Sequence, residues 1–546
     1  MTLFGSSDRR ATTTIPGARS TPVIDNRRVP SFAFGMTLIM VLALQFTGCA
    51  TTSLHSGALR QRFVSFEAAA ARNPELSEVA STFDRLVTPA PGPHERTREL
   101  NLFAEVVELA RSDYVESVEV AKLAKSAISG MERAVATDGG DKSAGGAPTA
   151  SGYQGDDGGA QAAALPATNS ARANHLGTAP LIEAALVGML HDLDAHSDYM
   201  SPESYREMQV RTRGEFGGIG IEVTMENGLI KVVSPIDDTP AHAAGLKAGD
   251  LVTHIDARPV LGLTLPEAVE AMRGPVGSKV TVTIRRVSVE KPFDIVVTRD
   301  IVRIRSVRWH LEGDIGYLRV TTFNERTSEG VHHAVAKMRE TLGDALAGLI
   351  IDLRNNPGGL LDQALSVSDA FLDDGEIVST RGRQQGEIRR FTADSEDILG
   401  DLPIAVLINS GSASAAEIVA GALQDQGRAL VIGARSFGKG SVQTIMPVSG
   451  GGAVRLTTAR YYTPAGRSIQ LTGIQPDIIA PIEEGEQASR EADLDNVLPA
   501  EGELGEVAAA RLEERCPGAV GLEDVVLACA KQIVSENHAV TAQKSH

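Results

Sequence analysis

The hydrophobic and polar positions of this 546-residue chain change period along its length, and helical spacing dominates the first part. Apolar residues recur three and four apart in residues 98–110, 120–131 and 181–190, a spacing that predicts amphipathic helices. Leucine, alanine, glycine and methionine are spaced alike in 123–131 and 181–189. Either a local duplication or chance similarity between alanine-rich helices explains this match.

Strand-like spacing dominates the rest of the chain. A continuous apolar run at 349–353 predicts a buried strand, and a helix is predicted near 265–272. Alternating apolar and polar runs, which predict further strands, lie at 216–223, 230–233, 279–284, 441–445 and 454–460. The mixture predicts an α/β multidomain fold, and the chain has enough length and apolar content, at 42% hydrophobic residues, to build more than one core.

Charge and cysteine usage argue against several functions. The formal net charge of −18 disfavours a nucleic-acid partner. Residues 433–440 nearly match a phosphate-binding loop, but Gly440 stands where the magnesium-binding hydroxyl belongs, and a strand rather than a helix is predicted next. The chain has no Cys-x-x-Cys motif and no Cys/His cluster, so we expect neither a metal site nor another cofactor.

Ser414 and Lys439 are the residue types of a serine/lysine hydrolase. Ser414 opens a predicted helix, and Glu417 three residues later also fits a capping box, which is the structural alternative for this serine. A nucleophile at a helix start holds a developing oxyanion near free backbone N–H groups. Lys439 lies between Gly438 and Gly440, where close packing can desolvate the amine and keep it neutral enough to act as a base.

A glycine-rich turn supplies a second set of candidate donors. The predicted strand at 349–353 runs into a turn that ends in Gly358 and Gly359. Paired glycines at a strand end adopt positive φ and can present N–H groups to an anion, although most such turns only reverse the chain.

Several motifs in this order resemble the carboxyl-terminal processing peptidases, the tail-specific serine proteases of family S41. The motifs are 352–360 (DLRNNPGGL), 412–423 (SASAAEIVAGAL), 437–443 (FGKGSVQ), 462–470 (YTPAGRSIQ) and 473–477 (GIQPD). The resemblance implies that Ser414 is the nucleophile, that Lys439 is the general base and that Gln443 orients the lysine. It also implies an oxyanion hole made by the N–H of Ala415 and of one glycine, Gly358 or Gly359.

Residues 214–287 resemble a PDZ domain, which binds an extended peptide tail by adding it to the edge of a sheet. The resemblance places the carboxylate-binding loop at Gly218, Ile219, Gly220 and Ile221. Arg273 matches a position at which some family members couple the PDZ domain to the active site. The alternative for Arg273 is a solvated loop arginine.

The amino terminus predicts export. Basic residues precede an apolar run at 32–44, and small residues precede Cys49, which resembles a bacterial lipoprotein signal. Ordinary signal cleavage and an uncleaved amino-terminal anchor are the alternatives. We expect a bacterial periplasmic protein that is lipid-anchored to a membrane through Cys49, with the outer membrane favoured in a Gram-negative host. Cys516 and Cys529 then remain as an even pair, which favours a structural disulfide in an exported protein.

These features predict seven segments. They are a leader and signal peptide (1–48), an N-terminal helical region (49–135), a disordered low-complexity insert (136–178), a helical cap segment (179–213), the PDZ domain (214–287), an α/β serine protease core (288–485) and a C-terminal helical extension (486–546). The family uses no histidine in its serine/lysine chemistry, so we expect no catalytic role for His191 or His196.

Two functions are consistent with these features. The first is an exported serine endopeptidase that cleaves proteins near unstructured apolar C-termini recognised by its PDZ domain. The second is a lipid-tethered PDZ scaffold with an inert protease domain. The joint presence of Ser414, Lys439, Gln443 and both glycine-rich donors favours the endopeptidase. Its expected partners are protein substrates with exposed C-termini, the membrane, an adaptor protein and further copies of the chain, with no nucleic acid.

Overall fold

The structure is a computed structural model that describes residues 64–138, 176–236, 238–384, 386–481, 490–501 and 509–544. The chain divides into two units, Met1–Arg60 and Gln61–His546, and all described residues belong to the second. The predicted leader and signal peptide, Cys49 and most of the 136–178 insert lie outside the described residues. No helix in the described part of the chain is long and apolar enough to span a membrane.

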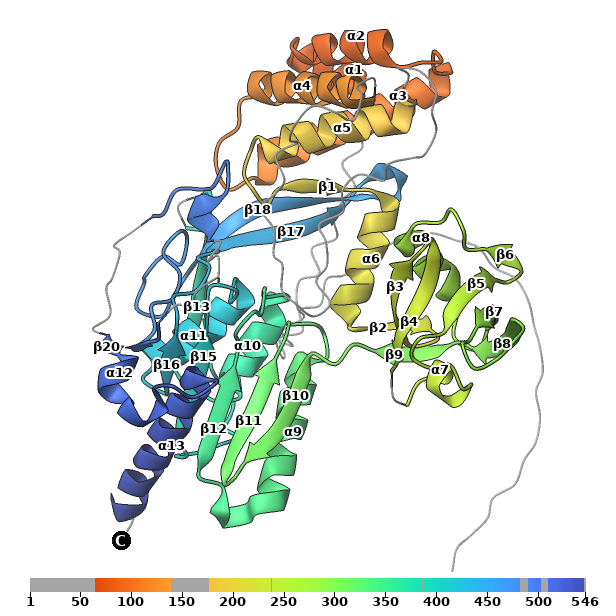
Figure 1. Cartoon of the computed structure of the whole chain (residues 1–546). Coiled ribbons are helices and arrows are strands. Elements are labelled where there is room, and N and C mark those ends of the chain that lie inside the picture. The colour runs from red at the N-terminus through yellow and green to blue at the C-terminus, as the bar shows by residue number, and fades with distance from the viewer. Residues whose placement is uncertain are drawn as a thin grey trace, which may run out of the picture. The chain divides into compact units, whose positions relative to one another are not determined.

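A seven-stranded sheet lies at the centre of the protease core, in the order β10-β11-β12-β15-β16-β19-β20 (Figure 1). Only β10 runs antiparallel to its neighbour. The central strands are nearly all apolar, as expected for parallel strands that are covered on both faces. The strands are β10 (Val307–Glu312), β11 (Ile315–Val320), β12 (Gly348–Asp352), β15 (Ile404–Ile408), β16 (Ala429–Gly433), β19 (Ile478–Ile479) and β20 (Ala510–Arg511).

Helices cover both faces of this sheet. Leu349 and Ile351 of β12 pack in one cluster with residues of α9 (Thr327–Leu342), α10 (Leu361–Asp369) and α11 (Ala415–Asp425). Ile350 faces the other way because successive strand side chains alternate, and it packs in a second cluster with residues of α12 (Leu512–Arg515) and α13 (Val525–Lys544).

A second sheet joins the helical segment to the core. Its strands are β1 (Asp198–Met200), β18 (Ala453–Tyr462), β13 (Glu376–Gly382) and β14 (Ile388–Thr392), with β17 (Ser441–Pro447) paired to β18. The two strands predicted from alternation at 441–445 and 454–460 are thus confirmed as β17 and β18. The predicted cap segment contributes β1, which pairs antiparallel with β18.

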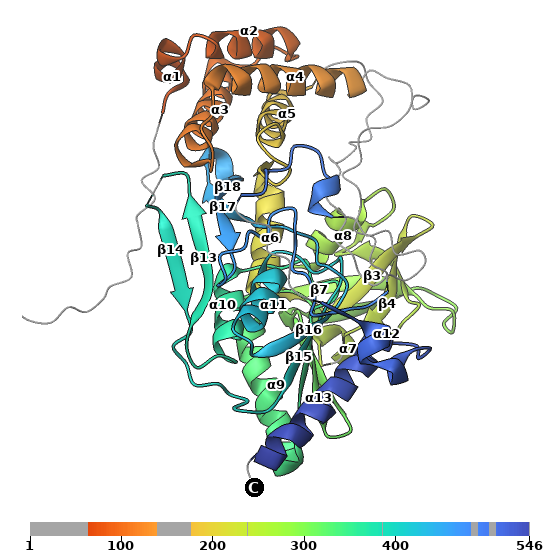
Figure 2. The ribbon, with the colours of Figure 1, turned by 90° about the vertical axis from the view of Figure 1, so that its left-hand side faces the viewer.

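The helical region has its own apolar cluster. Its helices are α1 (Phe66–Arg72), α2 (Leu76–Leu86), α3 (Pro93–Asp113), α4 (Val120–Asp138) and α5 (Thr178–His191), followed by α6 (Pro202–Arg213). Figure 2 shows α2 lying along α4, and residues of both helices share one buried cluster with those of α3 and α5. The boundaries predicted for the insert were slightly wrong, because α4 continues to Asp138 and α5 begins at Thr178.

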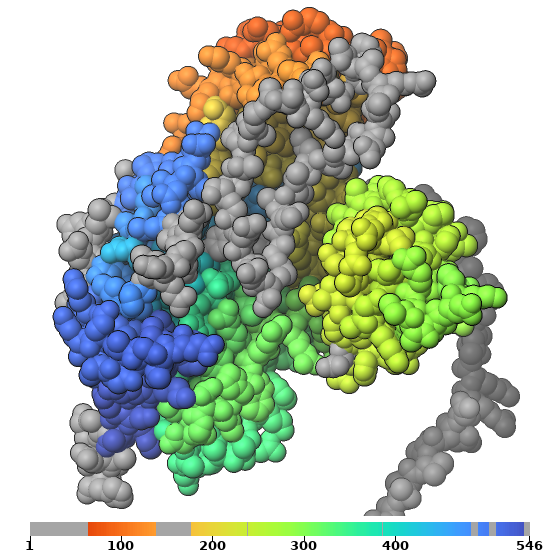
Figure 3. All heavy atoms as spheres, in the orientation of Figure 1, coloured from red at the N-terminus to blue at the C-terminus, as the bar shows by residue number. Residues whose placement is uncertain are grey.

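The PDZ segment forms a compact lobe with a separate core, coloured yellow to green in Figure 3. Its sheet has the order β3-β4-β5-β7-β8, with β3 at one edge. This lobe extends past the predicted boundary at 287, because β8 pairs with β7 and β9 pairs with β2. The elements are β2 (Glu215–Gly218), β3 (Ile221–Glu226), β4 (Leu229–Pro235), α7 (Pro240–Ala243), β5 (Leu251–Ile255), β6 (Arg258–Pro259), α8 (Leu265–Met272), β7 (Lys279–Arg285), β8 (Phe293–Thr298) and β9 (Asp300–Arg303). The predicted helix at 265–272 is confirmed as α8.

The C-terminal extension contains a long helix. The sequence predicted a helical extension over 486–546, and within it α13 begins at Val525 and continues to Lys544. Asp524 fixes this start, because its Oδ1 accepts the N–H of Leu527 at 2.9 Å and caps the first turn.

Candidate active site

Three adjacent parallel strands bring the candidate residues to one edge of the core sheet. The chain leaves the carboxyl end of β12 into the Gly358–Gly359 turn, the end of β15 into Ser414, and the end of β16 into the Lys439 loop. Because neighbouring parallel strands end on the same side, loops that are far apart in sequence meet there.

Ser414 occupies a strained backbone position directly before α11. Its φ of 54° and ψ of −113° lie in a region that non-glycine residues rarely adopt, and the residue is only 9% exposed. Its backbone N–H donates to Glu417 Oε2 at 2.7 Å, which is one half of the predicted capping box. Burial raises the pKa of the neighbouring Tyr461, and the interaction of its hydroxyl with the Ser414 side chain offsets part of the rise.

Glu417 holds the serine and lysine loops together. Its Oε2 accepts the backbone N–H of both Ser414, at 2.7 Å, and Lys439, at 3.0 Å. Its Oε1 accepts from the Ser436 hydroxyl at 2.6 Å and the Gly438 N–H at 2.7 Å. Glu417 is fully buried, and burial raises its pKa to about 7 against the lowering effect of these four donors.

The Lys439 ammonium is disfavoured by its surroundings. Burial, and then the positive charge of Arg455, lower the pKa of Lys439 to about 8, while the charges of Glu491, Asp194 and Glu417 act in the opposite direction. An amine with this pKa is neutral in about a tenth of the molecules at pH 7 and in about half at pH 8, and this neutral form can accept a proton.

The two glycines of the turn differ in whether their backbone N–H groups are available to an oxyanion. The N–H of Gly358 donates to Asn356 Oδ1 at 2.9 Å. A Cβ at position 358 would lie 2.9 Å from the Ser414 Cβ and 3.0 Å from the Ala415 nitrogen, so this glycine keeps open the space in front of that nitrogen. Two N–H groups near Ser414 therefore remain as candidate donors to an oxyanion within the described residues. One belongs to the exposed Gly359, and the other belongs to the buried Ala415, the first residue of α11.

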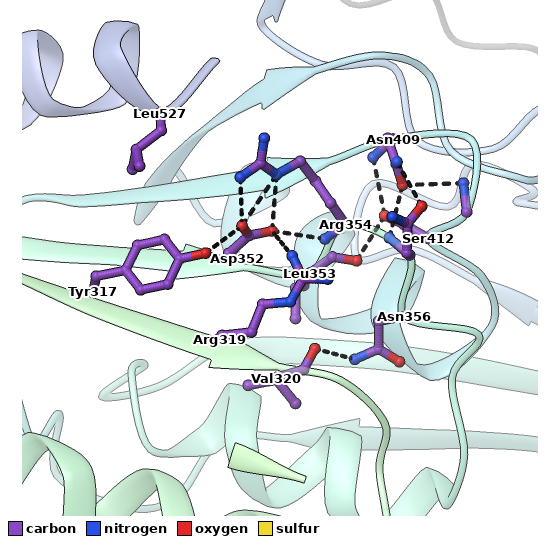
Figure 4. A network of polar contacts seen from close by, with 12 residues as sticks. Tyr317, Arg319, Val320, Asp352, Leu353, Arg354, Asn356, Asn409, Ser412 and Leu527 are labelled. Atoms are coloured by element: carbon purple, nitrogen blue, oxygen red, sulfur yellow. Dashed lines mark hydrogen bonds and ion pairs between the residues drawn. The ribbon is translucent and has the colours of Figure 1, made fainter. Parts of the chain in front are cut away.

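Polar contacts fix the strand end that precedes this turn (Figure 4). The buried Asp352 carboxylate binds the Arg354 guanidinium, at 2.7 Å, Arg319 and the Tyr317 hydroxyl. Burial acts to raise the pKa of Asp352, but the hydrogen bonds and charge of Arg354 lower it more. The Asn356 amide donates to the Val320 carbonyl at 2.8 Å, so the middle of the turn is anchored to the end of β11 as well.

Known proteins match both main parts of the chain. The sequence model of peptidase family S41 matches residues 314–480, and that of a PDZ domain matches 231–286. A carboxy-terminal-processing protease of Bartonella bacilliformis is 58% identical over 300 residues, which are 55% of this chain and 69% of that protein. The chain belongs to peptidase family S41. It is a carboxy-terminal-processing serine peptidase with a PDZ domain.

Other relatives of this S41 peptidase match less closely. A Staphylococcus epidermidis protein described as "Probable CtpA-like serine protease" is 37% identical over 301 residues, covering 55% of this chain and 60% of that protein. Among solved structures, the photosystem II D1 C-terminal processing protease is 27% identical, covers 70% of this chain and 93% of its own, and gives a TM-score of 0.38.

Gln443 of the peptidase contacts two hydroxyl groups through its amide nitrogen, and its role in orienting Lys439 stays a prediction. It lies on β17, and its Nε2 donates to Ser441 Oγ at 2.9 Å and Thr457 Oγ1 at 3.3 Å. Thr457 Oγ1 in turn donates to Asp194 Oδ1 at 3.0 Å. Gln443 therefore belongs to a buried polar network beside Lys439, and its amide nitrogen is committed to two hydroxyls.

The two histidines for which no catalytic role was expected differ in environment. The His191 side chain is 58% exposed and lies 3.3 Å from Asp198. The His196 side chain is 18% exposed, and its Nε2 lies 2.8 Å from an oxygen of the buried Glu491. Neither Glu491 nor its contact with His196 was predicted, because no local motif marks a pair 295 residues apart.

The predicted carboxylate loop of the PDZ domain has its carbonyl groups turned inward. The Ile219 carbonyl accepts the Ala241 N–H at 2.8 Å, and the Gly220 carbonyl accepts the Ile236 N–H at 3.0 Å. In a planar trans peptide the carbonyl and the following N–H point in opposite directions. The N–H groups of Gly220 and Ile221 therefore point away from these contacts. Gly218, the last residue of β2, pairs with Asp300.

Arg273 is half-buried rather than a solvated loop residue. It ends α8, and its guanidinium lies 4.7 Å from the centre of the Phe216 ring on β2. The next residue, Gly274, donates its N–H to the Gly217 carbonyl at 3.1 Å. Arg273 thus ties the end of α8 to the strand that leads into the carboxylate loop.

A disulfide joins Cys516 and Cys529 in the C-terminal extension. Asp524, between them, receives a bidentate ion pair from Arg354 at 3.1 and 2.9 Å. The stapled segment is therefore in direct contact with the polar network at the end of β12.

Proposed function

We propose that this S41 peptidase is an exported endopeptidase with a Ser414/Lys439 dyad that cleaves proteins near unstructured apolar C-termini. The observation that carries the proposal is the shared carboxylate oxygen of Glu417, which accepts the backbone N–H groups of both residues. It holds the nucleophile and the base in one arrangement before substrate arrives, and such preorganisation is what dyad chemistry requires.

The proposed reaction is acyl transfer. Lys439 Nζ accepts the hydroxyl proton as Ser414 Oγ attacks the scissile carbonyl, and the ammonium then gives this proton to the departing amine. The N–H groups of Ala415 and Gly359 stabilise the oxyanion, while Gly358 keeps the space open. Water then attacks the acyl-enzyme with Lys439 again as base. Gln443 acts indirectly, through the Thr457 and Asp194 network.

Substrate selection is assigned to the PDZ domain. Strand β3 lies at a sheet edge, so an extended tail can pair with it, and the outward N–H groups of Gly220 and Ile221 suit a terminal carboxylate. Ile219 and Gly218 complete the loop. Arg273, stacked on Phe216, would carry the effect of a bound tail toward the protease core.

The dyad is tested by paired substitutions, with cleavage of a peptide that ends in an apolar free carboxylate as the readout. Ser414→Ala should abolish cleavage. Ser412→Ala should keep most of it, because the Ser412 hydroxyl bonds to the Leu353 carbonyl and the Asn409 N–H instead of facing substrate. Lys439→Arg should be inactive, since guanidinium does not deprotonate. Cleavage by a folded Ser414→Ala protein would reject the proposal and favour the inert PDZ scaffold.

Export and anchoring form a separate part of the proposal. The disulfide between Cys516 and Cys529 suits an oxidising compartment such as the bacterial periplasm. Lipidation at Cys49 would hold the protein at a membrane, by preference the outer membrane in a Gram-negative host. Labelled palmitate should mark the wild type and not Cys49→Ser, which should lose its membrane association. An unlabelled, released wild-type protein would indicate ordinary signal cleavage.

A further inference from the structure

A buried ionisable pair lies beside the Lys439 loop and has no part in the chemistry described above. His196, between α5 and β1, places its Nε2 2.9 and 2.8 Å from the two carboxylate oxygens of Glu491, in a short helical turn at Glu491–Asp493. Glu491 is fully buried. A buried carboxylate needs such partners, so the pair by itself is explained as a satisfied contact that fastens two segments together.

Glu491 is also connected to the chain on both sides of Lys439, directly on one side and through Gln470 on the other. Its backbone N–H donates to the Phe437 carbonyl at 3.1 Å, two residues before the lysine. Its Oε1 accepts from Gln470 Nε2 at 2.9 Å, and Gln470 Oε1 accepts the N–H of Gly440, directly after the lysine, at 2.9 Å. The pair is thus connected to the lysine loop by three hydrogen bonds, and Glu491 and Gln470, which form them, are fully buried.

The His196 end of this chain is also fixed. The backbone N–H of His196 donates to Asp194 Oδ1 at 2.8 Å, and its carbonyl accepts from Arg455 Nε at 3.0 Å. Burial, then the charge of Lys439, lower the pKa of His196. The imidazole is therefore neutral where Lys439 titrates, and its Nε2–H donates to the Glu491 carboxylate.

We propose that His196 and Glu491 are positioning residues for Lys439. The inference rests on the proposed dyad function and adds the groups that hold its base. Glu491 fixes the loop on both sides of Lys439 and places a negative charge near the amine, while His196 orients the Glu491 carboxylate. The charged or titratable groups that act on Lys439 are Arg455, Glu491, Asp194, Glu417 and His196.

The test measures kcat and KM of the full-length protein between pH 6 and 10 on one tail peptide. His196→Leu removes the donor to Glu491 and should lower kcat by roughly 10- to 100-fold, with KM little changed, because the base loses its alignment. His196→Gln keeps an N–H donor near the position of Nε2 and should recover kcat to within about threefold of wild type. The matched control is His191→Leu, an exposed histidine that should behave as wild type.

Glu491→Gln provides a second readout that a purely structural contact would not change. The Glu491 charge raises the pKa of Lys439, so its removal lowers that pKa. Because the neutral amine is the active form, the acid limb of kcat/KM should move to lower pH by about half a unit or more. This variant also serves if His196→Leu does not fold.

Two results separate the failure of this inference from failure of the dyad. If Lys439→Arg or Ser414→Ala cleaves the peptide, the proposed function itself is wrong. If both are inactive, while His196→Leu matches His191→Leu in kcat and Glu491→Gln keeps the wild-type acid limb, the dyad stands and the positioning role of His196 and Glu491 is overturned.

Discussion

The backbone N–H groups of Ser414 and Lys439 donate to the same oxygen, Oε2 of Glu417. The two residues follow different strands of the core sheet, so this one carboxylate sets their relative position. Its other oxygen is bound to the Lys439 loop as well, through Ser436 and Gly438. The fully buried Glu417 therefore orders both halves of the proposed dyad.

Replacing Glu417 with glutamine should expose this role. An amide cannot accept from all four donors, because its NH₂ group faces N–H or O–H groups. We expect kcat to fall roughly 10- to 100-fold with a smaller change in KM, since the loops lose alignment. Glu329→Gln, at the exposed first turn of α9, is the matched control and should retain wild-type kinetics. Wild-type kcat in the Glu417→Gln protein would contradict the role.

The pH dependence of peptide cleavage should follow the deprotonation of Lys439. Burial lowers the pKa of Lys439 to about 8, and in the proposed dyad only the neutral amine can accept the Ser414 proton. Activity, measured as kcat/KM, should therefore rise with pH and level off above about pH 8. A profile that is flat from pH 6 to 9 would mean that another group, or no titrating group, limits the reaction.

The same shift predicts that the lysine destabilises the fold. The folded-state pKa of Lys439 lies below the unfolded value of 10.5, so the unfolded chain binds the proton more tightly. Below pH 8 the full penalty applies, and it disappears as the pH rises toward 10.5. In urea unfolding, the free energy of unfolding of Lys439→Met should therefore exceed that of the wild type by on the order of 3 kcal/mol at pH 7, with a smaller gain at pH 10. An equal gain at both pH values would show that packing rather than charge is responsible.

Local sequence patterns were sufficient to predict much of this molecule. Strands β12, β17 and β18 and helix α8 follow from apolar spacing, while the roles proposed for Ser414 and Lys439 come from short motifs that resemble those of the family. In each case the signal lies within about ten residues, where periodicity and glycine placement act directly.

Long-range contacts account for what sequence reasoning missed. The sequence marks Glu417 only as a capping residue, because its bonds to Gly438 and Lys439 cross from α11 to the loop after β16. The Gly358 N–H was a candidate oxyanion donor, but the Asn356 side chain, two residues away, accepts it. The pair of His196 and Glu491 depends on the packing of segments 295 residues apart, for which no local rule exists.

Gly358→Ala should close the proposed oxyanion site. A Cβ there would lie 2.8–3.0 Å from atoms of Ala413, Ser414 and Ala415, at a φ of +100° that alanine rarely adopts. We expect kcat to fall by about 100-fold or more, as when an oxyanion donor is lost. Gly427→Ala, which also has positive φ but nothing within 4 Å, controls for backbone strain. Equal activities of the two folded variants would show that the space in front of Ala415 is not used.

Amidation of the substrate's C-terminus should separate recognition from chemistry. It removes the charge that the Gly220 and Ile221 N–H groups are proposed to bind, and a charge-assisted hydrogen bond contributes about 1.5–3 kcal/mol. The amidated peptide should therefore be used roughly tenfold to a hundredfold less well, mainly through KM. If the PDZ domain also gates the active site, kcat should be lower for the amidated peptide as well. Arg273→Ala should then reduce the difference in cleavage between the free-acid and amidated peptides. Arg258→Ala, an exposed arginine on β6, should leave the difference intact. Equal, Ser414-dependent cleavage of both peptides would mean that the enzyme does not recognise free C-termini.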